Sequence, residues 1–130
     1  MGNHLAQKDA NSPWGPYFLS LHAEQGKHFE RAEWMIELAL KKAPGLGILY
    51  YQKGRLLWLQ GKYNQAVDAF EYAVKRKVHL VESHLFLGKI FLRDFELKLA
   101  KDHLEVVLKS APRNKEALLS LSQVYSLKRD

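Results

Sequence analysis

The sequence predicts an all-α fold made of repeated helix pairs, and three observations support this prediction. Small residues recur at intervals of 34, as at Ser20, Gly54, Gly88 and Ser122. Alanines and larger apolar residues recur at the same interval, as at Ala32, Ala66, Ala100, Ile36, Phe70 and Leu104. Within one repeat these residues lie three or four positions apart, which places them on one face of a helix.

The helices follow from the apolar spacing and from the residues that bound them. Residues 1–12 are mostly polar and lack periodicity, so we expect a flexible N-terminal arm there. Ser12 and Pro13 then provide an N-cap and a first helical position, which predicts a helix over 13–25. A second helix is predicted over 29–42, because a proline soon after it cannot continue the hydrogen-bond ladder.

The period carries this helix pair through the rest of the chain. The predicted parts are the units 13–46, 47–80 and 81–114 and a terminal helix over 115–128, with seven helices in all. In the second unit, helices are predicted over 47–60 and 63–77, with Gly61 at the turn between them. Val78 stands where both neighbouring units have proline, so the end of the second unit is less sharply defined.

Composition narrows the class of protein. The chain is 47% hydrophobic and has no cysteine, and none of its apolar stretches is long enough to span a membrane. The N-terminus lacks the apolar segment of a secretory signal, so we expect a cytoplasmic protein. The net charge of +6 could indicate nucleic acid. However, Lys41, Lys75 and Lys109 lie where helices are predicted to end and stabilise the negative end of the helix dipole, which argues against a nucleic-acid partner.

The sequence carries no pattern typical of a catalytic or metal site. The six histidines lack the His-Glu-x-x-His spacing of a zinc site. The chain has neither a glycine-rich phosphate loop nor a nucleophile elbow. We therefore expect no enzymatic activity, no cofactor and no bound metal.

The second unit contains the most regular set of repeat residues, namely Gly54, Gly61, Tyr63, Ala66, Phe70 and Ala73. A helix-turn-helix period of 34 with these residues resembles the tetratricopeptide repeat. The resemblance covers 13–128 and departs from the family pattern at Lys53, where leucine is preferred, and at Val78, where proline is preferred. It implies a right-handed α-solenoid of three helix pairs plus a C-terminal helix, which serves as a protein-binding adaptor or scaffold.

The resemblance also implies which face binds a partner, because the first helix of each pair lines a concave groove in such repeats. The corresponding positions are Trp14, Tyr17, Leu21, Tyr51, Arg55, Trp58, Leu85, Lys89, Leu92 and Arg93. They predict a groove for an apolar segment of another protein, with Arg55, Lys89 and Arg93 attracting acidic residues that flank it. The alternative is that some side chains on these helices, Trp58 and Leu59 especially, only pack between adjacent repeat units.

One known use of this fold is not predicted for this chain. Repeats that hold the acidic C-terminal tails of heat-shock chaperones resemble one another in a lysine and an asparagine at two positions of the first unit. Tyr17 and Leu21 stand at those positions here, so we expect no such clamp.

The terminal helix is a second candidate interface. We expect Leu118, Leu121 and Tyr125 to pack on the third unit. Three other apolar residues then form an edge without a covering helix, namely Leu119, Val124 and Leu127. This edge could bind another chain, including a second copy, or the sequence could belong to a longer array, or the helix could simply fray.

Three functions follow from these observations. The first is an adaptor that binds a partner peptide or helix in its groove. The second is a small chaperone, similar to those of bacterial secretion systems, that holds an aggregation-prone client. The third is a self-assembling structural subunit that uses the C-terminal edge.

Overall fold

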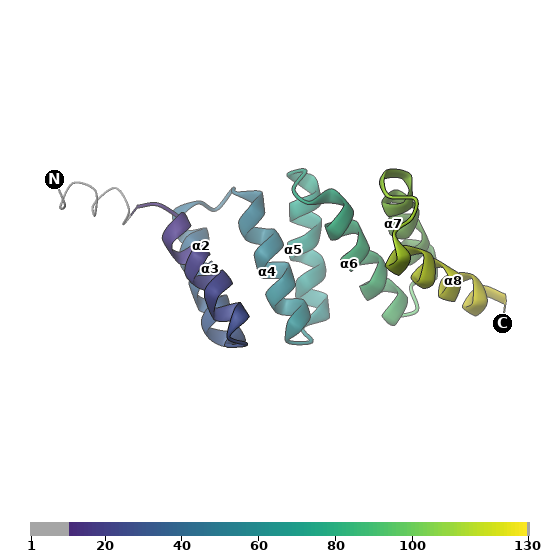
Figure 1. Cartoon of the computed structure of the whole chain (residues 1–130), viewed down its shortest axis with the longest axis horizontal. Helices are drawn as coiled ribbons and strands as arrows, with labels where there is room; N and C mark the ends of the chain where they lie inside the picture. The colour runs from purple at the N-terminus through teal and green to yellow at the C-terminus, as the bar shows by residue number, and fades with distance from the viewer. Residues whose placement is uncertain (1–10, 130) are drawn as a thin grey trace. The chain divides into compact units, whose positions relative to one another are not determined.

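The computed structural model describes residues 11–129, and this part of the chain is helical and contains no strand (Figure 1). Its helices are α2 (Trp14–Gln25), α3 (Phe29–Lys42), α4 (Gly47–Leu59), α5 (Tyr63–Lys75), α6 (Leu80–Arg93), α7 (Leu97–Ser110) and α8 (Lys115–Arg129). The seven helices of the described residues confirm the all-α prediction and closely follow the predicted ranges. Most of the predicted N-terminal arm, residues 1–10, lies outside the described residues.

The chain forms two compact units, which are described one at a time. The N-terminal unit is residues 1–69 and the C-terminal unit is residues 70–130, so the boundary falls within α5. In the N-terminal unit, α3 packs against both α2 and α4. Their shared core contains Ala23, Ala32, Ile36, Ala39, Leu40, Leu49 and Leu56. The alanines add little bulk, so the helices can approach closely around the larger side chains.

In the C-terminal unit, α7 packs against both α6 and α8. The core of this unit contains Ala100, Leu104, Val107, Ala117 and Val124. Phe70 of α5 stacks on Phe86 of α6, with ring centroids 4.6 Å apart. Each unit therefore repeats one arrangement, in which the second helix of a pair packs against its own partner and against the first helix of the next pair.

The terminal helix α8 packs through a different face from the one predicted. Ala117 and Val124 are buried, and Leu121 packs against the same core. Leu118 and Tyr125, which were expected to pack, are 47% and 48% exposed. The expectation that Val124 lies on an exposed edge is therefore wrong. The physical reason is that Ala117, Leu121 and Val124 follow each other at spacings of four and three, and so form one helix face toward α7.

Each helix pair turns through a residue with a left-handed backbone at the same place in the repeat. Lys27, Gly61 and Phe95 have φ of 62°, 77° and 59° and are separated by the repeat interval. The following residue donates its N–H to a carbonyl five residues earlier, as from His28 to Ala23 at 2.9 Å. This is a Schellman motif, which satisfies the free carbonyls of a helix end. Glycine adopts such a φ at the least cost, but the turn forms here without glycine in two of the three helix pairs, at Lys27 and Phe95.

The connection from α5 to α6 differs from the other two connections between pairs. Ala43 and Ala111, each followed by proline, have φ of −144° and −135°, outside the helical region that a following proline disfavours. Where Val78 replaces the proline, Lys77 and His79 instead have left-handed φ of 60° and 45°. Two left-handed residues thus accommodate the missing proline, and the helical repeat continues.

Gly88 marks a close approach between α6 and α7. A Cβ atom at Gly88 would lie 2.7 Å from Cδ2 and 2.8 Å from Cγ of Leu104. Leu104 is fully buried, so it has little room to move away. Glycine therefore permits this contact, although it costs about 1 kcal/mol of helix propensity relative to alanine.

We predict that Gly88→Ala destabilises the protein even though alanine favours helices. Overpacking a core costs about 1–3 kcal/mol, against a propensity gain of about 1 kcal/mol, so we expect a net loss of up to about 2 kcal/mol. The free energy of unfolding in urea measures this loss. In a Leu104→Ala background the same glycine substitution should cost nothing, because the clashing atoms are gone. A Gly88→Ala variant at least as stable as the wild type would contradict the close packing.

Candidate functional site

The face of α2 that was predicted to bind a partner carries a cluster of aromatic rings. Trp14 and Tyr17 meet edge to face, with centroids 5.6 Å apart. The Phe18 ring lies 6.5 Å from that of Trp14 and 5.4 Å from that of Tyr17. Trp14 is 44% exposed and Phe18 is 61% exposed, whereas Tyr17 packs partly buried against the core. Mutual contact holds these rings in place while leaving aromatic surface open to a partner.

Beside the aromatic cluster, α2 and α4 share a partly buried network of hydrogen bonds. Ser20 Oγ donates to the carbonyl of Ala32 at 2.8 Å. Gln52 Nε2 donates to Glu24 Oε1 at 2.9 Å and to Ser20 Oγ at 3.4 Å. Arg55 binds both carboxylate oxygens of Glu24, at 2.6 and 3.1 Å, and donates to Gln52 Oε1 at 3.1 Å. Among the described residues, no buried side-chain polar atom lacks a partner.

This network gives Arg55 a different role from the predicted one. Its guanidinium was expected to attract an acidic partner, but it already holds the Glu24 carboxylate in a two-pronged pair. Such pairs are among the stronger hydrogen-bonded contacts in proteins and fix both side chains. The pair also affects Tyr17: burial raises the pKa of its hydroxyl, Arg55 opposes this rise, and Glu24 adds to it.

Sequence reasoning did not find the network. Ser20 was recognised only as a small residue of the repeat, and Gln52 was not singled out at all. Gln52 is 2% exposed, which is unusual for glutamine. The available signal was the spacing of three between Gln52 and Arg55, which places two polar residues on one face of a largely apolar helix.

In the C-terminal unit, the predicted partner-binding residues lie on α6. Leu85 and Leu92 are partly buried and pack against the core of that unit. Lys89 Nζ lies 3.4 Å from Glu116 Oε1 of α8. Surface ion pairs of this kind contribute at most about 1 kcal/mol, so the pair weakens the field of Lys89 without fixing its position.

Arg93 resembles Lys89 in having a carboxylate nearby. Its Nη1 atom lies 3.7 Å from Oδ1 of Asp94. All three predicted basic residues, Arg55, Lys89 and Arg93, therefore have an acidic neighbour within their own unit. The expected attraction for acidic flanks of a partner is correspondingly reduced.

Three further predicted residues are partly buried on their helices, namely Leu21, Tyr51 and Trp58. Trp58 meets the Tyr63 ring edge to face, with centroids 5.3 Å apart. Part of the Trp58 surface is thus used within its own helix pair, which is neither the predicted partner contact nor the packing between repeat units that the alternative describes. The binding role of these residues stays a prediction.

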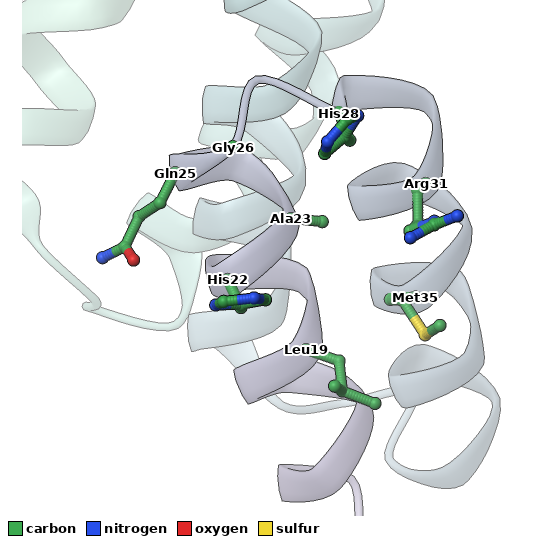
Figure 2. A pocket seen from close by; sticks show the side chains of 8 residues that line it. All are labelled: Leu19, His22, Ala23, Gln25, Gly26, His28, Arg31 and Met35. Carbon is green, nitrogen blue, oxygen red and sulfur yellow. The ribbon is translucent and has the colours of Figure 1, made fainter.

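A cleft of about 540 Å³ lies between α2 and α3 on a surface that the sequence did not predict. Its lining residues are Leu19, His22, Ala23, Gln25, Gly26, His28, Arg31 and Met35 (Figure 2). Figure 2 shows Leu19 and His22 along α2, facing Arg31 and Met35 along α3. Leu19 is 52% exposed, and the lining combines apolar, imidazole and guanidinium groups without a carboxylate.

A pair of histidines joins α6 and α7. The Nδ1 atoms of His84 and His103 are 2.9 Å apart, so one ring donates its N–H to the lone pair of the other. The Phe91 ring stacks on His103, with centroids 5.5 Å apart. Burial lowers the pKa of both imidazoles, and for His103 the nearby His84 lowers it further while Asp102 opposes the shift. The described residues contain no cluster of three or more side chains that could hold a metal ion.

Comparison with known proteins gives a clear result for structure only. No protein-family model and no curated protein sequence matches the chain. YrrB, a TPR protein with an unusual peptide-binding site, is 17% identical with a TM-score of 0.86, over 97% of this chain and 65% of YrrB. The first TPR of Spaghetti (RPAP3), bound to the HSP90 peptide SRMEEVD, is 16% identical with a TM-score of 0.85, over 93% and 96% of the two chains. The Sgt2 TPR domain from Aspergillus fumigatus is 16% identical with a TM-score of 0.77, and the match covers 90% of this chain and 79% of the Sgt2 domain.

These observations define the chain first as a helical-repeat protein, in which each helix pair is covered by the next helix along the chain within each unit. The solved structures then identify the repeat. The chain has the tetratricopeptide-repeat fold, as the resemblance in its sequence predicted. Within the described residues, no helix has the length and apolar character needed to cross a membrane.

The histidine pair predicts that stability falls in mild acid. The fold lowers the pKa of His84 and His103 below the ordinary 6.5, so the unfolded chain binds these protons first. Their stabilising contribution is complete above pH 6.5 and is lost as the pH falls through 6.5 toward the lowered values. Urea midpoints measured across this range should decline toward acid, and less steeply in His84→Gln/His103→Gln. Equal slopes in the wild type and the double variant would contradict the prediction.

Proposed function

We propose that the chain is a protein-interaction adaptor that binds an apolar peptide or helix of a partner on the face formed by α2 and α4 of the N-terminal unit. The aromatic cluster of Trp14, Tyr17 and Phe18 carries this proposal. Aromatic rings that are fixed before binding bury a large area while losing little conformational entropy. The adjacent Glu24–Arg55 pair supports the same function, because it holds α2 and α4 in register beneath that face.

The chemistry of this face favours an apolar segment over an acidic tail. The RPAP3 domain is bound to the HSP90 peptide SRMEEVD, whose last residues include three acids. In this chain, Tyr17 and Leu21 occupy the two positions where the resemblance places a lysine and an asparagine. An acidic tail would also have to compete with Glu24 for Arg55. We therefore propose a partner that is anchored by apolar side chains, with acidic flanks of secondary importance.

This proposal predicts that Trp14→Ser/Tyr51→Ser loses its partner. Capture from a lysate of the source organism, followed by mass spectrometry, should recover a protein with the wild type that is depleted at least about tenfold with the double variant. Trp34→Ser is the matched control, since Trp34 is 62% exposed on α3 and lies outside the proposed face. Circular dichroism checks that all three proteins are folded. A partner retained equally by the wild type and the double variant would reject this face as the binding site.

A second candidate function, self-assembly through α8, is supported by exposed apolar side chains. Leu119 is 67% exposed and Leu127 is 38% exposed, and Leu118 and Tyr125 add to the apolar surface of the same helix. Val124 takes no part, because it is buried in the C-terminal unit. Leu119 and Leu127 lie about two turns apart along α8, and exposed apolar groups on one helix commonly mark a contact with another protein.

If α8 joins copies of the chain, the wild type should show a mass that rises with concentration in light scattering after size exclusion. Leu119→Glu should abolish this rise, because it places a charge at the most exposed of these leucines. Leu99→Glu provides the control at a leucine of α7 that is 43% exposed. A mass that does not change with concentration, or that changes equally in both variants, would remove this function.

A further inference from the structure

We propose that the cleft between α2 and α3 binds an acidic amphipathic helix of a partner protein, which packs on α2 as α3 packs on α4. This surface differs from the face assigned to the adaptor function. Three features of the N-terminal and C-terminal units support it: the way the repeat covers its own first helices, the exposure of α2 at the same positions, and the charge of the cleft.

The N-terminal unit shows how a first helix is normally covered. Leu49 and Leu56 of α4 are fully buried in the core that α4 shares with α3. Between them along the helix, Lys53 Nζ forms an ion pair with Glu37 Oε1 of α3 at 2.8 Å. The face of α4 at these positions is therefore occupied by a helix, through apolar contact combined with a carboxylate.

The C-terminal unit repeats this arrangement, with α7 covering α8 as α3 covers α4. Ala117 and Val124 of α8 are fully buried, and Leu121 joins them in the core shared with α7. Two repeat intervals separate Ala117 and Val124 from Leu49 and Leu56, so the same repeat positions are used. The preceding helix therefore covers these repeat positions on α4 in the N-terminal unit and on α8 in the C-terminal unit.

On α2 the same positions are open. One interval before Leu49 and Leu56 are Gly15 and His22, and one interval before Lys53 is Leu19. Leu19 is 52% exposed, and a Cβ atom at Gly15 would meet no described atom within 4 Å. Leu19 and His22 line the cleft (Figure 2). The cleft therefore lies on the face of α2 that corresponds to the helix-covered faces of α4 and α8.

Charge indicates the chemistry of the occupant. At the equivalent place on the next pair, Glu33 Oε2 of α3 accepts hydrogen bonds from Gln60 at 3.0 Å and Lys62 at 3.4 Å. His28 stands one repeat interval before Lys62 and lines the cleft, and Arg31 lies beside it. Carboxylates on an incoming helix would complement these groups, as Glu33 does for Lys62. Apolar residues on its inner face would cover Leu19, giving the helix-in-groove mode of recognition.

The test uses a stapled helical peptide labelled with fluorescein. The peptide carries isoleucine, alanine and leucine at the spacing of Ile36, Ala39 and Leu40, and glutamate at its charged positions. A matched peptide carries lysine in place of every glutamate. Fluorescence anisotropy should show that the acidic peptide binds the full chain at least about tenfold more tightly than the lysine peptide. Leu19→Asp should lower the affinity for the acidic peptide about tenfold, and Arg31→Glu should reverse the preference between peptides.

Two controls separate this cleft from other surfaces. Leu99→Asp changes a similarly exposed leucine on α7 and should bind the acidic peptide as the wild type does. Trp14→Ser/Tyr51→Ser should also bind normally, so that failure of the adaptor proposal and failure of this one can be told apart. Loss of peptide binding in that double variant, with Leu19→Asp unaffected, would place the peptide on the adaptor face and overturn the inference.

Other results would also overturn it. Equal binding of the acidic and lysine peptides, or no binding of either at about 1 mM, would reject the proposed chemistry. Tighter binding after deletion of residues 1–10 would identify the chain itself as the occupant. A dimer of the wild type that Leu19→Asp converts to a monomer would identify a second copy instead.

Discussion

Close contact between helices through alanine and glycine is the constraint on which the structure depends. Helices of this length are marginal in water by themselves, so each must bury one face against its neighbours. The residues that permit this contact are buried in all three pairs, namely Ala32, Ala39, Ala66, Ala73, Ala100 and, at the glycine position of α6, Gly88. The clash that a Cβ atom at Gly88 would make with Leu104 shows how little space is left. A larger residue at any of these positions would push a helix out of contact with its neighbours.

The fold could be predicted from the sequence because this constraint leaves a periodic trace. Close contact requires small residues at fixed intervals, because larger side chains would not fit between the helices. The period of 34 is therefore visible in the sequence even though the turns vary. Lys27 and Phe95 replace glycine in left-handed turns, and Val78 replaces proline, without disturbing the helices. Packing between the helices thus matters more than the local chemistry of the turns. The packing residues by themselves predict the arrangement of the helices.

The functional surfaces could be predicted only in part, because they depend on which polar groups pair across helices. Arg55 has the same repeat position whether it faces a partner or binds Glu24, and nothing in the spacing reveals that carboxylate. The prediction for Val124 is wrong for a related reason: the larger apolar residues of α8 indicate one face, whereas the small Ala117 lies in the core with Val124 and places that face against α7. Periodicity fixes where a residue lies on a helix, but its neighbours across the interface decide whether it is available.

Charge pairing also explains how a basic chain can present surfaces with different preferences. On the first helices, the cations are held by carboxylates of their own unit, as Arg55 is by Glu24 and Lys89 is by Glu116. The cleft beside α3 has Arg31 in its lining and no carboxylate there. An ion pair within a unit reduces the field that an incoming acid experiences, so the aromatic face should select by apolar contact and the cleft by charge. The net charge of +6 describes neither surface, because the distribution of carboxylates determines where the positive field remains.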